Sequence, residues 1–284
     1  GSRGLGEVYK TQKSQYEVDL KKDTTVSDWF PRFGYDKTNG LWVRQHLKQP
    51  IAKKVTANEN IRYTTKKDWR NEFNVNWENA GNYARVTQGY FDDSDDNWIK
   101  KQPSLLVGHT ARIGNSPFHY SVNGEYGRWK QGAVKSNHKM YNVGLSYDPI
   151  RFEGWKLNLS TSYEVTHESY NNAHYNGLNY DATLTKDFDD RWSGYGAYRY
   201  QKNNRENSPF DFDNDDYSRK VEAGFSYRID ENNRVAFGSK YDVDNATWRK
   251  FDYYWFHDMH CSQVILHYEG RDKTWKVKWR FLPI

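Results

Sequence analysis

The charged residues best placed to do chemistry lie in the last segment of the chain, where cations alternate with apolar side chains. The apolar positions are Trp275, Val277, Trp279 and Phe281, and the positions between them are Lys276, Lys278 and Arg280. Arg70, Arg199 and Arg228 occupy the same polar positions in earlier alternating segments. Cations gathered on one face attract carboxylate and phosphate groups. The pattern therefore predicts an anion-binding face made of these six cations.

Carboxylates share this polar face and offer a second interpretation of the cations. They are Glu72, Glu164, Asp181 and Glu222. Opposite charges on one face of a sheet pair with each other across neighbouring strands. A balanced lining of ion pairs therefore stays open beside a face that binds external anions.

Two acidic clusters and one short His-containing stretch have residue types that bind metals. They are Asp92, Asp93, Asp95 and Asp96, then Asp211, Asp213, Asp215 and Asp216, and the stretch His257, Asp258, His260 and Cys261. Neither cluster has the glycine and final glutamate of an EF-hand loop. In a strand, moreover, neighbouring residues of the stretch would point to opposite faces. We expect solvated loops and a turn here, with no metal site and no cofactor.

Catalytic motifs are absent from the sequence. It has no Gly-x-Ser-x-Gly elbow, and its nine histidines are scattered. We predict that the chain is not an enzyme, and an active site assembled from distant strands stays open as the alternative. Since the pI is near 8.9 and no clustered basic helix occurs, we expect no nucleic-acid partner.

Alternation of period two, the pattern of a β-strand with two different faces, recurs along most of the chain. It is clearest over residues 69–78, 155–166 and 221–230. Short turn signals such as Asp187 to Arg191 and Asp230 to Asn233 separate some segments, and the polar run Asn203 to Asp216 separates others. We count about 14–16 strands, with Tyr16 to Leu20 and Asn97 to Val107 ambiguous.

Composition indicates where these strands lie. Aromatic residues reach 17% although all hydrophobic residues reach only 36%, and the mean hydropathy is −1.10. No run approaches the roughly 20 apolar residues of a membrane helix. A closed sheet with lipid outside and water inside accounts for both the polarity and the amphipathic Tyr and Trp. A soluble β-sandwich also alternates, but it needs an aliphatic core that this chain lacks.

The predicted fold is therefore all-β, a transmembrane antiparallel β-barrel. Each cation on the lipid face at mid-membrane would cost about 2–4 kcal/mol, so Lys276, Lys278 and Arg280 must face the lumen. We expect residues 1–30 to form an N-terminal segment leading into the barrel and residues 31–284 to form the barrel. One cysteine, Cys261, excludes an internal disulfide.

Three segments resemble the LptD (OstA) family of lipopolysaccharide-assembly proteins. The first is Phe30-Pro31-Arg32-Phe33-Gly34-Tyr35 followed by residues 39–43, and the second is Pro103-Ser104-Leu105 followed by residues 113–126. The third runs from Tyr241-Asp242-Val243-Asp244-Asn245 through Asp258-Met259-His260-Cys261 to Arg280-Phe281. Together they cover about a third of the chain, which would be a short form or barrel fragment of that family.

The resemblance implies a function and partners. Such proteins receive lipopolysaccharide from a periplasmic transport bridge, pass its head group through the barrel and release it between the first and last strands. It implies contact with outer-membrane lipid, a plug lipoprotein, and a location in the outer membrane of a diderm bacterium. Pro31 or Pro50 would weaken the seam, because proline donates no hydrogen bond to a strand ladder.

A second function stays open beside lipopolysaccharide insertion. A barrel rich in Tyr and inward cations also fits an anion-preferring porin for acidic oligosaccharides or other small solutes. Weak pairing between the first and last strands favours the translocon, whereas steady conductance favours the porin. In either case the expected ligand is lipopolysaccharide or another anionic saccharide.

Overall fold

The fold is taken from a computed structural model of the 284-residue chain. The structure describes residues 16–19, 22–23, 28–36, 40–66, 68–92, 98–211, 218–271 and 273–281. Nearly all of them lie in β-strands. The one short helical element is the 3₁₀ turn η1 (Arg205–Asn207), and no helix within these ranges is long and apolar enough to cross a membrane.

Eighteen strands are assigned within the described ranges. They are β1 (Tyr16–Asp19), β2 (Lys22–Asp23), β3 (Asp28–Asp36), β4 (Gly40–Ala52), β5 (Val55–Thr64), β6 (Asp68–Asn79), β7 (Asn82–Asp92), β8 (Trp98–Arg112), β9 (Phe118–Gln131), β10 (Val134–Phe152), β11 (Trp155–Glu168), β12 (Ala173–Asp187), β13 (Trp192–Asn203), β14 (Arg219–Arg228), β15 (Asn233–Asp242), β16 (Thr247–Met259), β17 (Ser262–Glu269) and β18 (Thr274–Phe281).

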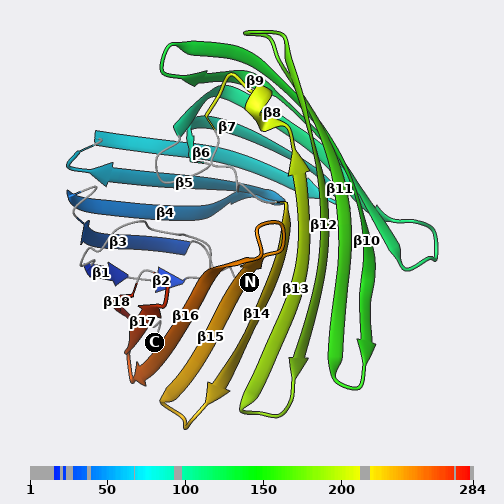
Figure 1. The fold of residues 1–284 in the computed structure, drawn as a ribbon. Helices are drawn as coiled ribbons and strands as arrows, with labels where there is room; N and C mark the ends of the chain where they lie inside the picture. Colours follow the sequence, from blue (N-terminus) through cyan, green and yellow to red (C-terminus); the bar gives the residue numbers. More distant parts are fainter. Residues whose placement is uncertain are drawn as a thin grey trace.

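These strands form a single sheet that closes on itself. From β3 to β18 each strand pairs antiparallel with the next one along the chain. The ring is completed by β1, which pairs parallel with β18 and antiparallel with β3 (Figure 1). Closure satisfies the backbone groups that an open sheet edge would expose to lipid.

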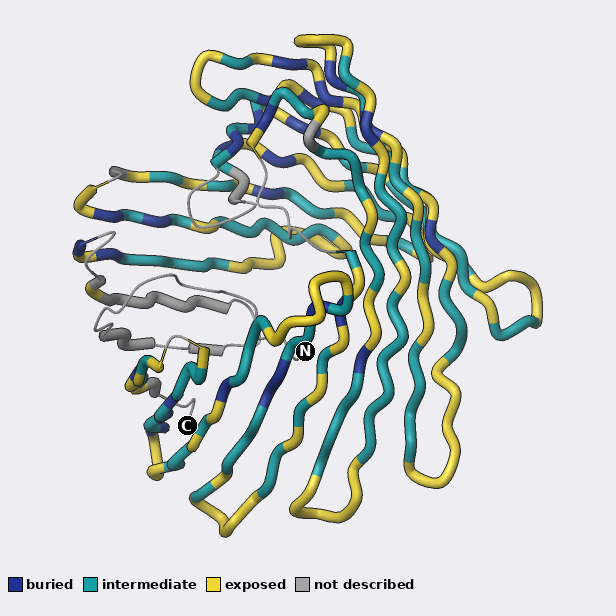
Figure 2. Tube along the Cα trace, in the orientation of Figure 1, coloured by how far each residue is buried: buried dark blue, intermediate teal, exposed yellow. Residues whose placement is uncertain are grey.

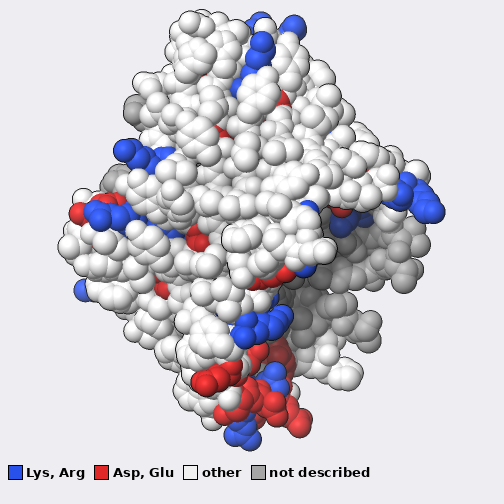
Figure 3. Space-filling model, turned by 90° about the vertical axis from the view of Figure 1, so that its right-hand side faces the viewer, with Lys and Arg blue, Asp and Glu red and all other residues white. Residues whose placement is uncertain are grey.

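The two faces of the sheet differ as the alternation predicts. On β6, Trp69 is 65% exposed while Asn74 on the opposite face is buried. On β10, Tyr141 and Val143 are exposed while His138 and Gly144 are buried. This alternation runs along most strands (Figure 2), and uncharged residues cover most of the outer face seen in Figure 3. An apolar outer face around a polar inner face is the arrangement of an outer-membrane-type β-barrel.

The predicted fold class is thus confirmed, and the strand count can be refined. Two of the eighteen strands, β1 and β2, have only four and two residues, which leaves sixteen described strands of eight residues or more. Both ambiguous segments contain strands, β1 and β8. Strand β3 begins at Asp28, before the predicted boundary at residue 31, and β1 and β2 from the predicted N-terminal segment pair with strands of the wall.

Tight turns join the strands at the end of the barrel that includes the β6–β7 and β10–β11 connections. Ala80-Gly81 and Glu153-Gly154 form two-residue hairpin loops in which both residues have positive φ. This geometry matches the right-handed twist of the flanking strands, and glycine adopts it at low cost. The long polar run predicted over Asn203 to Asp216 joins β13 to β14 at the opposite end, which we call the loop end.

Candidate functional site

The cations predicted on the last strand have different surroundings. Lys276 is buried and its ammonium lies 2.6 Å from a carboxylate oxygen of Glu269 on β17. Lys278 is partly buried on the same face of β18 as Lys276. Trp275, Val277 and Trp279 are exposed on the other face of this strand. Arg280 has the same parity in the strand, and its side chain lies outside the described residues.

Lys276 belongs to a network of charges on the inner wall of β16, β17 and β18. Asp252 is 2% exposed and accepts from the hydroxyl of Tyr254 at 3.1 Å. The ammonium of Lys250 lies 2.7 Å from the same carboxylate, and His267 Nε2 lies 3.3 Å from it. Burial strengthens each of these interactions, so the network fixes this part of the wall rather than leaving loose charges.

Arg199 and Arg228 also differ from each other. Arg199 lies between two carboxylates, with Asp181 at 2.8 Å on β12 and Glu222 at 2.9 Å on β14. Arg228 is exposed at the end of β14, next to the turn that Asp230 begins. The second interpretation of the cations, a lining of ion pairs, therefore describes Lys276 and Arg199.

Arg70 lies in a different environment from the other predicted cations. Its guanidinium carbon is 4.6 Å from the Trp98 ring centroid and 5.5 Å from that of Tyr90. Directly across the sheet, Arg70 is in register with Arg62 on β5, and Arg62 with Arg44 on β4. Periodicity along the chain identified Arg70 but not the other two, because only the hairpin register brings them side by side.

The connection between β13 and β14 folds inward at the loop end. Phe210 is 3% exposed and packs with Ile99 of β8 and Trp129 of β9. The backbone amide of Asp211 donates to the Gln131 side chain at 2.7 Å. The connection therefore starts at β13 and reaches β9, four strands away, so it lies across the inner wall (Figure 1).

A buried polar cluster lies beneath this inward-folded connection. Trp129 stacks on His138, and His138 Nδ1 is 2.6 Å from a carboxylate oxygen of Glu168. The Tyr175 hydroxyl donates to the same carboxylate at 3.1 Å, and Lys101 pairs with Glu125 at 2.6 Å nearby. We call Trp129, His138, Glu168, Tyr175 and Phe210 the loop latch. Sequence analysis missed the latch because its members come from four strands and a connection.

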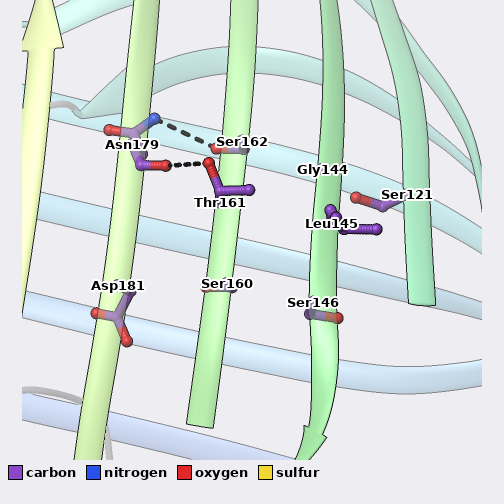
Figure 4. Close-up of a pocket in the computed structure, with 9 residues that line it drawn as sticks. All are labelled: Ser121, Gly144, Leu145, Ser146, Ser160, Thr161, Ser162, Asn179 and Asp181. Atoms are coloured by element: carbon purple, nitrogen blue, oxygen red, sulfur yellow. Dashed lines mark hydrogen bonds between the residues drawn. The ribbon is translucent and has the colours of Figure 1, made fainter. Parts of the chain in front are cut away.

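A hollow in the inner wall offers groups of a different kind. It has a volume of about 200 Å³ and is lined mainly by hydroxyl, amide and carboxylate side chains from β9 to β12 (Figure 4). Thr161 and Ser162 of β11 lie between Gly144 of β10 and Asn179 of β12. Asp181, also in this lining, is the carboxylate that pairs with Arg199 at 2.8 Å. Hydroxyl and amide groups of this kind hydrogen-bond the hydroxyls of saccharides.

Within the described residues, the pairings that close the ring between the first and last strands are short, and β2 adds two further pairs with β3. Four register pairs join β1 to β18, from Tyr16–Val277 to Asp19–Arg280, and four join β1 to β3. By comparison, eight pairs join β17 to β18 and fourteen join β11 to β12. We call the β18–β1–β3 pairing the seam.

The two prolines predicted at the seam are placed differently. Pro31 lies in β3 between the residues that pair with β1 and those that pair with β2, and it is opposite Gln45 on β4. Pro50 lies next to the bulge at the exposed end of the β4–β5 hairpin, away from the seam. The prediction that Pro50 lies at the seam is therefore wrong, because the β4–β5 pairing places this residue at a hairpin end, where a missing backbone N–H is tolerated.

The predicted acidic clusters lie mostly outside the described residues, and the stretch 257–261 spans the end of β16 and the turn that follows it. Residues 93–97 and 212–217, which hold most of both clusters, lie outside the described residues. His260 and Cys261 form the β16–β17 turn, as predicted. Within the described ranges, no group of three or more His, Cys, Asp or Glu side chains is arranged to bind a metal.

Comparison with known proteins gives structural neighbours only. No family model matches the chain, and no curated protein matches it. Among solved structures it is similar to OmpT, an outer membrane protein of Vibrio cholerae, with a TM-score of 0.37, 10% identity and coverage of 96% of this chain and 92% of that chain. It is also similar to an anion-selective porin from Comamonas acidovorans, with a TM-score of 0.39, 8% identity and 96% coverage of each chain.

Proposed function

We propose that this barrel inserts lipopolysaccharide into the outer leaflet of the bacterial outer membrane by opening at the seam. The single observation that supports this function is the closure itself, which within the described part of the chain comprises four residue pairs on each side of β1 and two between β2 and β3. A wall held by few backbone hydrogen bonds opens at a lower free-energy cost than one held by fourteen pairs. The resemblance of three sequence segments to the lipopolysaccharide-assembly family agrees with this choice.

The strand directions suggest how such an opening would work. β3 and β18 run antiparallel to each other, because every pairing from β3 through to β18 reverses the strand direction and the number of pairings is odd. β1 lies between them and pairs parallel with β18. Displacing β1 would therefore leave two edges that face each other across a gap and can pair again directly when the substrate has passed.

The interior supplies the environment that a sugar-phosphate head group needs. Charged networks line β16 to β18, and the hydroxyl-lined hollow lies on β9 to β12. The outer face carries exposed Trp and Tyr side chains for contact with acyl chains. In this proposal the head group travels in the lumen while the acyl chains stay in lipid. The chain acts without covalent chemistry or nucleic acid, and receives its substrate from a periplasmic bridge, with a plug lipoprotein as a further partner.

Locking the seam with a disulfide tests the proposal. Val18 and Trp279 are register partners between β1 and β18, and Tyr16 and Tyr35 between β1 and β3. The combined variant V18C/W279C/Y16C/Y35C in a C261S background should therefore close both sides of the seam under oxidising conditions. V264C/W279C joins β17 to β18 through the same Trp279 position and leaves the seam untouched, which makes it a matched control. We expect surface delivery of lipopolysaccharide to stop in the first variant, recover on reduction, and continue in the control. Undiminished delivery through a locked seam would contradict the proposal.

An anion-preferring porin is the second candidate, and the arginines at one level of the inner wall favour it. Arg44, Arg62 and Arg70 would raise the local concentration of anions in an open lumen. Planar-bilayer recording of the purified barrel distinguishes the two functions. A steady open current with anion preference supports the porin, whereas a low current that rises only after release of the seam supports the translocon.

A further inference from the structure

A row of arginines follows one level of the inner wall over β4, β5 and β6. Arg44 on β4 is in register with Arg62 on β5, and Arg62 with Arg70 on β6. On the seam side, the backbone position of Arg32 on β3 is in register with Arg44 and with Asp19 of β1. Neighbouring strands lie about 4.8 Å apart, so three consecutive strands present a cationic side chain at nearly regular intervals.

The described members of this row have restricted side chains. Arg62 is 9% exposed, and its guanidinium carbon lies 5.5 Å from the Trp98 ring, which Arg70 also contacts. The guanidinium carbon of Arg44 lies 5.2 Å from the Trp42 ring centroid. Stacking on an aromatic face holds a guanidinium plane while leaving its edge donors directed away from the ring. The aromatic residues thus fix the directions in which Arg44, Arg62 and Arg70 donate.

Like charges directly opposite each other across strands destabilise a sheet. Two consecutive registers with arginine on both sides therefore concentrate positive charge at this level of the wall, which attracts anionic groups. A guanidinium has five N–H donors, so an arginine that already meets an acceptor on the wall still has donors for another anion. The arrangement favours a ligand that bridges two or more neighbouring guanidiniums.

Phosphate fits this requirement better than carboxylate. A phosphate monoester carries a charge of about −1.5 to −2 and three strong acceptor oxygens, whereas a carboxylate carries one charge and two oxygens. Arginine forks bind phosphate through paired hydrogen bonds. A pyrophosphate, or two phosphates on one saccharide, could contact several arginines in the row together.

We propose that Arg44, Arg62 and Arg70 form a phosphate-binding row that receives phosphorylated saccharide head groups next to the seam. This site deepens the proposed function by naming the chemical group that is recognised, and it rests on that function only for its biological substrate. The row lies on β4 to β6, whereas Arg199 lies on β13 and Lys276 on β18.

Calorimetric titration of the purified full chain in detergent tests the site with three probes. They are inorganic pyrophosphate, a glucosamine disaccharide carrying two phosphates, and the same disaccharide without phosphate. We expect the first two to bind and the third not to bind. If only pyrophosphate binds, the row takes free phosphate but not the saccharide, and the assignment to head groups is wrong.

Substitutions then locate the binding. R44Q and R70Q should each weaken pyrophosphate binding by about tenfold or more, since a hydrogen bond to a charged group contributes about 1.5–3 kcal/mol. R62K should also weaken binding, because lysine keeps the charge but loses the fork. R112Q is the matched control, since Arg112 lies on β8 outside the row and pairs with Asp148 at 2.7 Å.

The outcomes separate this proposal from the proposed function. Wild-type affinity in an R44Q/R70Q double variant that keeps the heat-modifiable gel migration of a folded barrel would overturn the phosphate row. Because Arg44 and Arg70 are only partly buried, the test does not depend on the buried Arg62. Failure of the seam-locking experiment would instead overturn lateral insertion and leave pyrophosphate binding unaffected.

Discussion

The imidazole of His138 lies flat on the indole of Trp129, with ring centroids 3.6 Å apart and an interplanar angle of 11°. The ring centroid of Trp129 in turn lies 5.8 Å from that of Phe210 in the β13–β14 connection. Through these two rings, the inner wall of β9 and β10 meets a segment that begins four strands away. The stack therefore couples the position of the inward-folded connection to the wall.

Phe210→Ala should release the inward-folded connection from the wall. Phe210 is almost fully buried, and removing a buried phenyl ring costs about 3–5 kcal/mol in a well-packed site. Because the connection lies at the end of the wall, we expect the barrel to stay folded while protease cleavage within residues 204–218 accelerates at least tenfold. Tyr170→Ala, at an exposed aromatic in the β11–β12 turn, is the control and should leave cleavage unchanged.

Glu168→Gln should weaken the loop latch from the other side. Glu168 is fully buried and meets both His138 Nδ1 at 2.6 Å and the Tyr175 hydroxyl at 3.1 Å. A hydrogen bond to a charged group contributes about 1.5–3 kcal/mol, and the amide of glutamine accepts more weakly than the carboxylate. We expect a lower urea midpoint for unfolding in lipid vesicles, whereas Glu231→Gln, in the exposed β14–β15 turn, should unfold like the wild type. Equal midpoints for both variants would contradict the latch.

Much of the fold could be predicted from the sequence because one physical rule governs every strand. The exposure of Trp275 and Val277 and the burial of Lys276 follow from parity and the cost of a cation in lipid. The same rule places Asn74 inside and Trp69 outside on β6. Alternation needs no knowledge of which strands are neighbours, so it is readable along a single chain.

The site was harder to predict because it depends on register between strands. Arg44, Arg62 and Arg70 are separated by 18 and then 8 positions, and only the hairpin pairing aligns them. Likewise, His138 and Glu168 look like ordinary polar positions until the β10–β11 ladder puts them opposite each other. Pro50 shows the converse limit, since its ladder-breaking chemistry was predicted but its distance from the seam was not.

The β15–β16 turn should respond to acid through Asp244. Backbone and side-chain hydrogen bonds from Arg219 hold the pKa of Asp244 at about 2, and the Ser218 amide also donates to this carboxylate at 2.6 Å. An unfolded aspartate titrates near 3.9. Because the folded pKa is the lower one, the stabilisation is complete above about pH 4 and is lost as the pH falls toward 2.

Amide hydrogen exchange measures this titration directly. Protection of the Ser218 and Arg219 amides, corrected for the intrinsic pH dependence of exchange, should fall between pH 4 and pH 2 in the wild type. Asp244→Asn should show reduced protection at pH 7 and no further loss over that range. Protection that stays constant to pH 2 in the wild type would show that the Asp244 carboxylate does not hold the start of β14.

Two adjacent substitutions on β10 test the membrane face of the barrel. Val143 is 58% exposed on the outer face, and Asn142 is partly buried on the inner face of the same strand. Val143→Arg should destabilise the folded barrel in vesicles by about 2–4 kcal/mol, because the guanidinium would enter hydrocarbon. Asn142→Arg should change its stability by less than about 1 kcal/mol, since the lumen is wet.

The comparison within this pair isolates the side-chain direction. Both substitutions add the same group one residue apart, so strand propensity and denatured-state effects are nearly matched. If Asn142→Arg is the more destabilising of the two, the inner and outer faces of β10 have been assigned the wrong way round. The same reversal would place Lys276 and the arginine row in lipid, where so many cations would prevent the barrel from folding. This pair of variants therefore tests the side-chain orientation on which the phosphate row depends.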